Sequence, residues 1–250
     1  MLTENERIDT VNDGIKLIQR TDGLTYGTDA LLLSAYIKGK AKAMAELGSG
    51  TGIISLLLLN RGKAEHIYAY EVQEAFASLT KRNAELNNLS SRLTVIHKDV
   101  REIKGNDIPV EADAVFTNPP YMKNGAGLSN SSDEKNIARR EIYGSIADFC
   151  SSVRKVLKHG GRFYCVYRPD RLIELLCAMR NNGIEPKRMT FVHPDPDSAP
   201  SLVLVEGRNG AGVELKVTRP LIIYTNKDHL KYTEDTAYIY ENGSFPAERF

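Results

Sequence analysis

The residues with the clearest chemical potential lie midway along the chain, where the apolar run Asp113–Phe116 passes into Thr117-Asn-Pro-Pro-Tyr121. Two successive prolines stop a strand, because proline has a fixed φ angle and no N–H to donate to a sheet. Such a rigid turn could hold the Asn118 amide and the Tyr121 ring over a substrate. It could also be a simple strand terminator, so the interpretation depends on the neighbouring sequence.

A glycine-rich turn, Glu46-Leu-Gly-Ser-Gly-Thr-Gly52, joins another expected strand to a helix. At this point a doubly wound sheet brings a ligand against backbone N–H groups. The dinucleotide fingerprint requires a third glycine where this chain has Ile53, so that signature fails. Packing alone could also demand glycines at such a turn.

Two carboxylates accompany the glycine turn. Glu71 ends the next strand about 20 residues later, where a carboxylate can accept both hydroxyls of a ribose. Asp99 closes the following strand, where it could accept the exocyclic amine of an adenine. Each alone would be read as a solvated carboxylate at a strand end. Together with the glycines they predict a site for an adenosine without a phosphate chain.

These residues must be positioned by strands and helices that alternate along the chain. Alternating elements predict βαβ units, a parallel sheet and helices on both faces, which is a doubly wound α/β fold. The expected strands are 14–20, 41–47, 66–72, 93–99, 112–118, 162–168, 184–194 and 201–207, and the expected helices are 29–37, 53–62, 74–88, 146–161 and 170–182.

Three segments are expected. Residues 1–40 form an N-terminal hairpin and helix, residues 41–211 form the main domain, and residues 212–250 form short C-terminal strands that pack on it. The Asn242-Gly243 pair is typical of a hairpin turn within that last segment.

The glycine turn, both carboxylates and Asn118–Tyr121 together resemble the Rossmann-like S-adenosylmethionine-dependent methyltransferases. More closely, the chain is similar to the bacterial tRNA adenine-N6 methyltransferases that act beside the anticodon of a valine tRNA. That similarity includes the N-terminal hairpin, Tyr26-Gly-Thr-Asp29, the segment Glu134–Glu141 and the tail. It implies a mostly parallel, seven-stranded sheet, S-adenosylmethionine as cofactor, S-adenosylhomocysteine as product and tRNA as substrate.

The resemblance also assigns roles to individual residues. Tyr26 and Asp29 would help to enclose the methionine end of the cofactor. The remaining cofactor-binding residues would be Glu46, Gly48, Ser49, Gly50, Thr51, Gly52, Glu71, Val72, Asp99, Val100 and Asn118.

The catalytic residues on this interpretation are Asn118, Pro119, Pro120 and Tyr121. An exocyclic amine is a poor nucleophile, because its lone pair is delocalised into the ring. Two acceptors directed at its N–H bonds, Asn118 Oδ1 and the Pro119 carbonyl held by Pro120, favour a more tetrahedral nitrogen. Tyr121 would stack on a base that has left its own stack.

The same four residues serve adenine N6, cytosine N4 and glutamine amides across related families. Methylation of a release-factor glutamine, of DNA adenine or cytosine, or of an rRNA base therefore stays open, as does a non-catalytic module that binds the cofactor and RNA. Substrate contacts are expected at Tyr121 and, in a glycine-containing flap, at Lys123, Arg139 and Arg140. The flap cations could equally be a solvated face.

Composition limits the remaining classes. A net charge of +1 gives no global attraction to polyanions, so any such site must be a local patch. The three cysteines have no CxxC spacing, which favours a reducing compartment and no structural metal. No signal peptide or membrane-spanning run is found. We expect a cytoplasmic monomer with no membrane and no metal partner.

Overall fold

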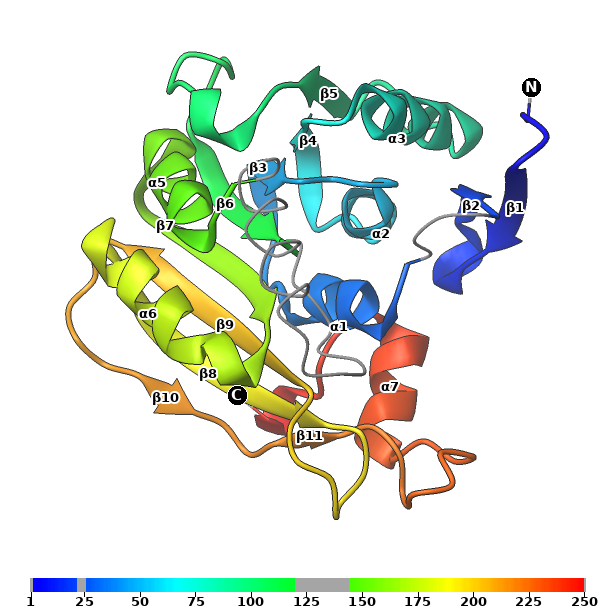
Figure 1. Ribbon diagram of the computed structural model, residues 1–250, viewed down its shortest axis with the longest axis vertical. Helices are drawn as coiled ribbons and strands as arrows, with labels where there is room; N and C mark the ends of the chain where they lie inside the picture. Colours follow the sequence, from blue (N-terminus) through cyan, green and yellow to red (C-terminus); the bar gives the residue numbers. More distant parts are fainter. Residues whose placement is uncertain (1, 22–25, 120–143, 250) are drawn as a thin grey trace, which may run out of the picture.

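The computed structural model describes residues 2–21, 26–119 and 144–249 of the chain. It is built around a nine-stranded sheet in the order β10-β8-β9-β7-β6-β3-β4-β5, with β11 also paired to β8 (Figure 1). The strands of this sheet are β3 (Ala41–Leu47), β4 (Ala64–Glu71), β5 (Leu93–His97), β6 (Ala112–Thr117), β7 (Leu157–Tyr167), β8 (Ile184–His193), β9 (Leu202–Asn209), β10 (Lys216–Val217) and β11 (Leu221–Ile222).

Only β9 runs against its neighbours β7 and β8, and every other pairing in the sheet is parallel. The predicted doubly wound, mostly parallel fold is therefore confirmed. Seven strands of five or more residues correspond to the expected sheet, and the two-residue strands β10 and β11 extend it along β8.

Helices cover both faces of the sheet (Figure 1). The α-helices are α1 (Thr28–Tyr36), α2 (Ile53–Asn60), α3 (Glu74–Leu86), α5 (Ile146–Val156), α6 (Leu172–Asn181) and α7 (Glu234–Asn242), and the short 3-10 helices are η1 (Asn12–Gly14), η2 (Val100–Glu102), η3 (Pro169–Arg171) and η4 (Ala247–Arg249). No helix in these described ranges is long and apolar enough to cross a membrane.

Two hydrophobic clusters form the core, one on each face of the sheet. Phe116 of β6 belongs to the cluster that contains α1 and α2, whereas its neighbour Val115 belongs to the cluster that contains α5 and α6. Successive side chains of a strand point to opposite faces, so a central strand must be apolar at consecutive positions. This explains the continuous apolar run before Asn118.

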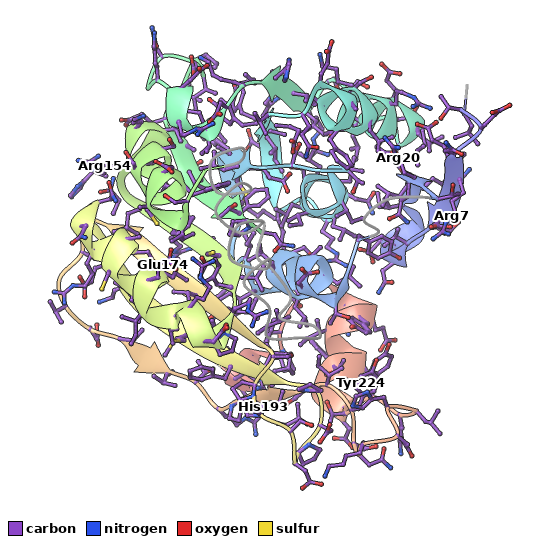
Figure 2. All side chains as sticks on the ribbon, viewed as in Figure 1. Arg7, Arg20, Arg154, Glu174, His193 and Tyr224 are labelled. Atoms are coloured by element: carbon purple, nitrogen blue, oxygen red, sulfur yellow. The ribbon has the colours of Figure 1, made fainter. Side chains whose placement is uncertain are left out.

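The N-terminal hairpin is confirmed. β1 (Glu6–Thr10) and β2 (Lys16–Arg20) pair antiparallel, and Arg7 and Arg20 project from it in Figure 2. α3 contacts the hairpin through Asn83 and Arg82. The Ile18 N–H donates to Asn83 Oδ1 at 2.7 Å, Asn83 Nδ2 donates back to the Ile18 carbonyl at 3.2 Å, and Arg82 pairs with Glu6 at 2.7 Å. Hairpin and main domain therefore share a buried hydrogen-bonded contact.

The C-terminal segment differs from the prediction of strands and a hairpin. Its two short strands exist, but residues 234–242 form helix α7, and Gly243 ends that helix with φ +59°. The Thr233 side chain caps the helix start by accepting from the Thr236 N–H at 3.3 Å. An Asn-Gly pair suits a tight turn and a helix end equally, because both need a residue with positive φ. The hairpin prediction was wrong.

A second difference concerns α5, which was expected to continue to Gly161. The helix ends at Val156, and Gly160 lies inside β7 with φ +73°. The Asn209 side chain donates to the carbonyls of Leu157 and Lys158, at 3.0 Å each, and so binds carbonyls that a longer helix would use internally.

The C-terminal segment packs along β8, to which its short strands β10 and β11 are paired. His193 and Tyr224 lie in this region (Figure 2), where the Ile223 N–H donates to the His193 carbonyl at 2.9 Å. Tyr224 stacks on His229 and Tyr232, with ring centroids 4.5 and 5.1 Å away. The hydrogen bond to His193 holds the segment before α7 against β8, and the ring contacts order the segment itself.

Candidate active site

The glycine turn between β3 and α2 has the backbone conformation that its sequence demands. Gly48, Gly50 and Gly52 have φ angles of +76°, +55° and +81°, a region that residues with a Cβ rarely adopt. The N–H groups of Gly48 and Ser49 donate to the Tyr70 carbonyl, at 2.9 and 3.0 Å, and so tie the turn to the end of β4. The turn is a fixed cradle at the carboxyl edge of the sheet.

Helix α3 supports this cradle from outside the glycine motif. The Thr80 hydroxyl donates to the Gly50 carbonyl at 2.8 Å, and Asn83 Nδ2 donates to the Thr51 carbonyl at 2.9 Å. The sequence interpretation missed both residues. Their signal was two buried polar side chains, three positions apart, on the packed face of an otherwise amphipathic helix.

Glu71 lies where the sequence placed it, at the end of β4, and is almost completely buried. Its Oε2 accepts from the Gly50 N–H at 2.8 Å and its Oε1 accepts from the Gln73 N–H at 2.9 Å. A carboxylate oxygen has two lone pairs, so both oxygens can still accept a hydroxyl. The carboxylate is thus oriented by the backbone and able to hold a diol.

Glu46 is 1% exposed and lies beneath the turn. Burial raises its pKa to about 8, against the opposing effect of Ser55, whose hydroxyl donates to Glu46 Oε2. From this position Glu46 can support the glycine cradle. Its direct contact with a cofactor stays a prediction.

Asp99 caps the start of η2, where its Oδ1 accepts from the Arg101 N–H at 2.8 Å. The Arg101 guanidinium also donates to both oxygens, which lowers the Asp99 pKa. The sequence interpretation did not include Arg101. This partner keeps Asp99 ionised and therefore an acceptor.

Val72 and Val100 flank these carboxylates. Val72 is half-buried and its carbonyl lies 2.9 Å from His97 Nε2, whereas Val100 is buried in the core and its carbonyl accepts from the Ser152 hydroxyl. Their apolar side chains suit the wall of a pocket for a flat ring.

Asn118 and Asp29 meet although 89 residues separate them in the sequence. Asn118 Nδ2 donates to Asp29 Oδ2 at 3.0 Å, and Asp29 Oδ1 accepts from the Ala30 N–H at 2.9 Å. Asn118 Oδ1 is buried and has no hydrogen-bond partner in the part of the chain that the structure describes. Since the carboxylate can only accept, the amide must direct its NH2 to Asp29 and its oxygen away from it.

Tyr26 and Gly27 lead into α1 on the same side of the site. Tyr26 is half-buried, and its N–H donates to Gln19 Oε1 at 3.0 Å. A Cβ at Gly27 would lie 2.6 Å from Asp29 Oδ1, so a larger residue at this position would displace the Asp29 carboxylate. The structure thus brings the Tyr26–Asp29 segment to Asn118.

Several predicted residues lie outside the described ranges. Of the predicted catalytic and substrate-binding residues, the structure describes Asn118 and the buried Pro119. The others lie outside the described ranges: Pro120, Tyr121, Lys123, Arg139 and Arg140. Within the described residues, no cluster of three or more His, Cys, Asp or Glu side chains could hold a metal ion.

The described residues fit an adenosine that carries no phosphate chain. The glycine cradle leaves room for close approach, and Glu71 offers two oriented oxygens. The buried Asn118 oxygen is a further acceptor, which lacks a donor among the described residues and could bind a second molecule. A buried acceptor without a partner costs about 1–3 kcal/mol, which a bound molecule can recover by donating to it.

Solved structures share this fold. A protein described as a predicted O-methyltransferase from Agrobacterium tumefaciens superposes with a TM-score of 0.69 at 24% identity, over 86% of this chain and 96% of that one. TYW2 from M. jannaschii, solved with AdoMet, gives a TM-score of 0.56 at 16% identity, over 83% and 87% of the two chains.

Sequence comparisons are more specific. A tRNA1(Val) (adenine(37)-N6)-methyltransferase of Bacteroides fragilis is 26% identical over 180 residues, which are 72% of this chain and 75% of that protein. The enzyme of the same name from Phocaeicola vulgatus is 27% identical over 180 residues, covering 72% and 74%. The family model "Methyltransferase small domain" matches residues 20–176, which span the hairpin end, the glycine cradle and Asn118. The chain belongs to this methyltransferase family and uses S-adenosylmethionine as its cofactor.

Proposed function

We propose that this methyltransferase acts on the N6 amine of an adenine in tRNA, in the anticodon loop and next to the anticodon of a valine tRNA. The observation that carries the proposal is the buried Asn118 Oδ1, which has no partner among the described residues while its amide NH2 is bound to Asp29. An acceptor oriented in this way calls for a substrate that brings an N–H donor, as an exocyclic amine does. The names of the curated relatives support tRNA adenine.

The chain's own residues contribute placement. When bound, S-adenosylmethionine supplies an electrophilic methyl group. Asn118 accepts one N–H of the amine and, with the Pro119 carbonyl as the second acceptor, keeps the nitrogen lone pair directed out of the ring plane. The Glu71 carboxylate holds the ribose hydroxyls of the cofactor, Asp99 its adenine amine, and the segment Tyr26–Asp29 encloses its methionine end. Tyr121 stacks on the target base, and Lys123, Arg139 and Arg140 contact substrate phosphates.

The experiment incubates the protein with labelled S-adenosylmethionine and, in parallel, unmodified tRNA, duplex DNA and a release factor, followed by digestion and identification of the labelled unit. We expect N6-methyladenosine from tRNA alone. Label on DNA or on glutamine would refute the tRNA assignment. Cofactor binding without label in any substrate would favour a non-catalytic module.

The role of Asn118 is tested by Asn118→Ala, with Asn181→Ala as the matched control because Asn181 is exposed at the end of α6. Loss of a transition-state acceptor should lower kcat by about 10²–10³. S-adenosylmethionine affinity should change little, and the control should behave as wild type. Parallel loss of cofactor binding and activity would contradict the proposed role.

A further inference from the structure

An open cavity of about 460 Å³ lies at the amino edge of the sheet, opposite the candidate active site. Ala41 begins β3, Ala114 lies near the start of β6, and Gly160 lies in the first half of β7. Six cationic side chains line it: Lys38, Lys40, Lys42, Lys158, Arg162 and Arg208.

Carboxylates do not balance this charge. Asp113, which also lines the cavity, forms an ion pair with Lys158, and Glu206 pairs with Arg162 at 3.6 Å. The exposed side chains of Lys40 and Lys42 have no ion pair with any described residue. A protein with a net charge of +1 therefore concentrates positive charge at one cavity.

The pKa of Lys38 reflects the same excess of positive charge. Burial is the largest cause that lowers its pKa, to about 8, and nearby Arg188, Lys216 and Arg162 lower it further while Glu206 opposes them. Positive potential from several elements thus converges on the cavity.

The chemistry of the lining selects phosphate groups. Lysine ammonium groups are point charges that neutralise phosphates without reading a sequence. Tyr164, the one aromatic side chain among the described residues that line the cavity, is fully buried and therefore presents no face on which a base could stack. Such a surface fits a sugar–phosphate backbone, not a nucleobase.

We propose that this cavity binds the sugar–phosphate backbone of the RNA substrate, at a point remote from the methylated base. The inference rests on the proposed function for its choice of RNA. Asp113 lies in β6 and Asn118 follows the strand directly, five residues later, so at about 3.3 Å per residue the cavity and the active site are separated by roughly 16 Å along the strand direction. One folded RNA can contact both edges, and the cavity would supply affinity while the active site selects the base.

The test variant is Lys40→Ala/Lys42→Ala, because neither side chain has an ion pair in the described structure whose loss would disturb the fold. The matched control, Lys81→Ala/Lys104→Ala, removes the same charge from exposed positions on α3 and after η2. Binding of unmodified tRNA is followed by fluorescence anisotropy between 50 and 300 mM salt, and methyl transfer to tRNA is assayed separately.

Loss of two phosphate contacts should weaken tRNA binding about tenfold near physiological salt and reduce the slope of log K against log[salt] by about 1.4–1.8. KM for tRNA should rise with kcat unchanged, and S-adenosylmethionine affinity should equal that of wild type.

The two proposals fail differently. Binding and salt slope equal to those of the control would overturn the cavity proposal even where tRNA adenine is methylated. If the wild type binds tRNA but methylates another substrate, and the lysine variant binds tRNA more weakly than the control, the result would support the cavity proposal and refute the proposed function. A wild type that binds no tRNA would refute both.

Discussion

Gly52 offers a sharp test of why the cofactor turn needs glycine. Gly50 and Gly52 both have positive φ angles, +55° and +81°, but their surroundings differ. A Cβ at Gly50 would meet no atom of the described residues within 4 Å, whereas a Cβ at Gly52 would lie 2.7 Å from Thr80 Cγ2. Alanine at Gly50 therefore tests backbone conformation alone, and alanine at Gly52 adds a steric clash.

The magnitudes follow from these two terms. A left-handed conformation costs a residue with a Cβ about 1–2 kcal/mol, partly offset because alanine restricts the unfolded chain. We expect Gly50→Ala to lower the free energy of unfolding by about 1 kcal/mol. Overpacking adds about 1–3 kcal/mol, so Gly52→Ala should cost about 2–4 kcal/mol. Thr80 is buried and β-branched, which limits its ability to move away.

Thr80→Ser isolates the clash, because it removes Cγ2 and keeps the hydroxyl that donates to the Gly50 carbonyl. Alone it should cost about 1 kcal/mol for one buried methyl group. Combined with Gly52→Ala it should recover about 1–2 kcal/mol of the loss. Urea unfolding at 25 °C without cofactor compares the four variants with the wild type, since a bound ligand would mask the differences. Equal costs for the two glycine variants, or additive effects of Gly52→Ala and Thr80→Ser, would refute the reasoning.

Two further predictions concern buried ionisable side chains. Glu46 has a pKa of about 8 in the folded protein, against 4.5 for an unperturbed carboxyl, so between these pH values the folded state binds more protons than the unfolded state. The free energy of unfolding should therefore fall as pH rises from about 4.5 to 8. In urea unfolding at pH 5 and 8, Glu46→Gln should remove this pH dependence, whereas the control Glu74→Gln, at an exposed position, should retain it. An equal change in stability between the two pH values for wild type and Glu46→Gln would contradict the raised pKa of Glu46. Lys63 Nζ donates to carbonyls at the ends of α1 and α7, including Ile37 at 2.8 Å and Gly243 at 3.0 Å, so Lys63→Met should lower the free energy of unfolding by about 2–4 kcal/mol. Exposed Lys81→Met is the control, and an equally small shift in Tm for both variants would show that these hydrogen bonds contribute nothing.

Local sequence patterns predicted the structure correctly where a few neighbouring residues determine the conformation. The apolar run before Asn118 indicated a strand buried on both faces, and Phe116 and Val115 do face opposite clusters. The prediction from local sequence failed where one dipeptide is compatible with two structures, as at Asn242-Gly243. It also failed where a side chain distant in sequence determines where a helix ends. The latter holds just after α5, where the carbonyls of Leu157 and Lys158 accept from Asn209, some fifty residues later in the chain.

Local sequence was enough to predict the sheet, the glycine turn and the strand-end position of Glu71, because backbone periodicity and the conformational freedom of glycine act over a few residues. The pairing of Asn118 with Asp29, which fixes the direction of the amide, could be seen only in the folded chain, as could the support that Thr80 and Asn83 give to the turn. Folding also gathers cations from residue 38 to residue 208 around one cavity. Each of those cations reads locally as an ordinary surface charge, and their proximity follows from the register of strands that are distant in sequence.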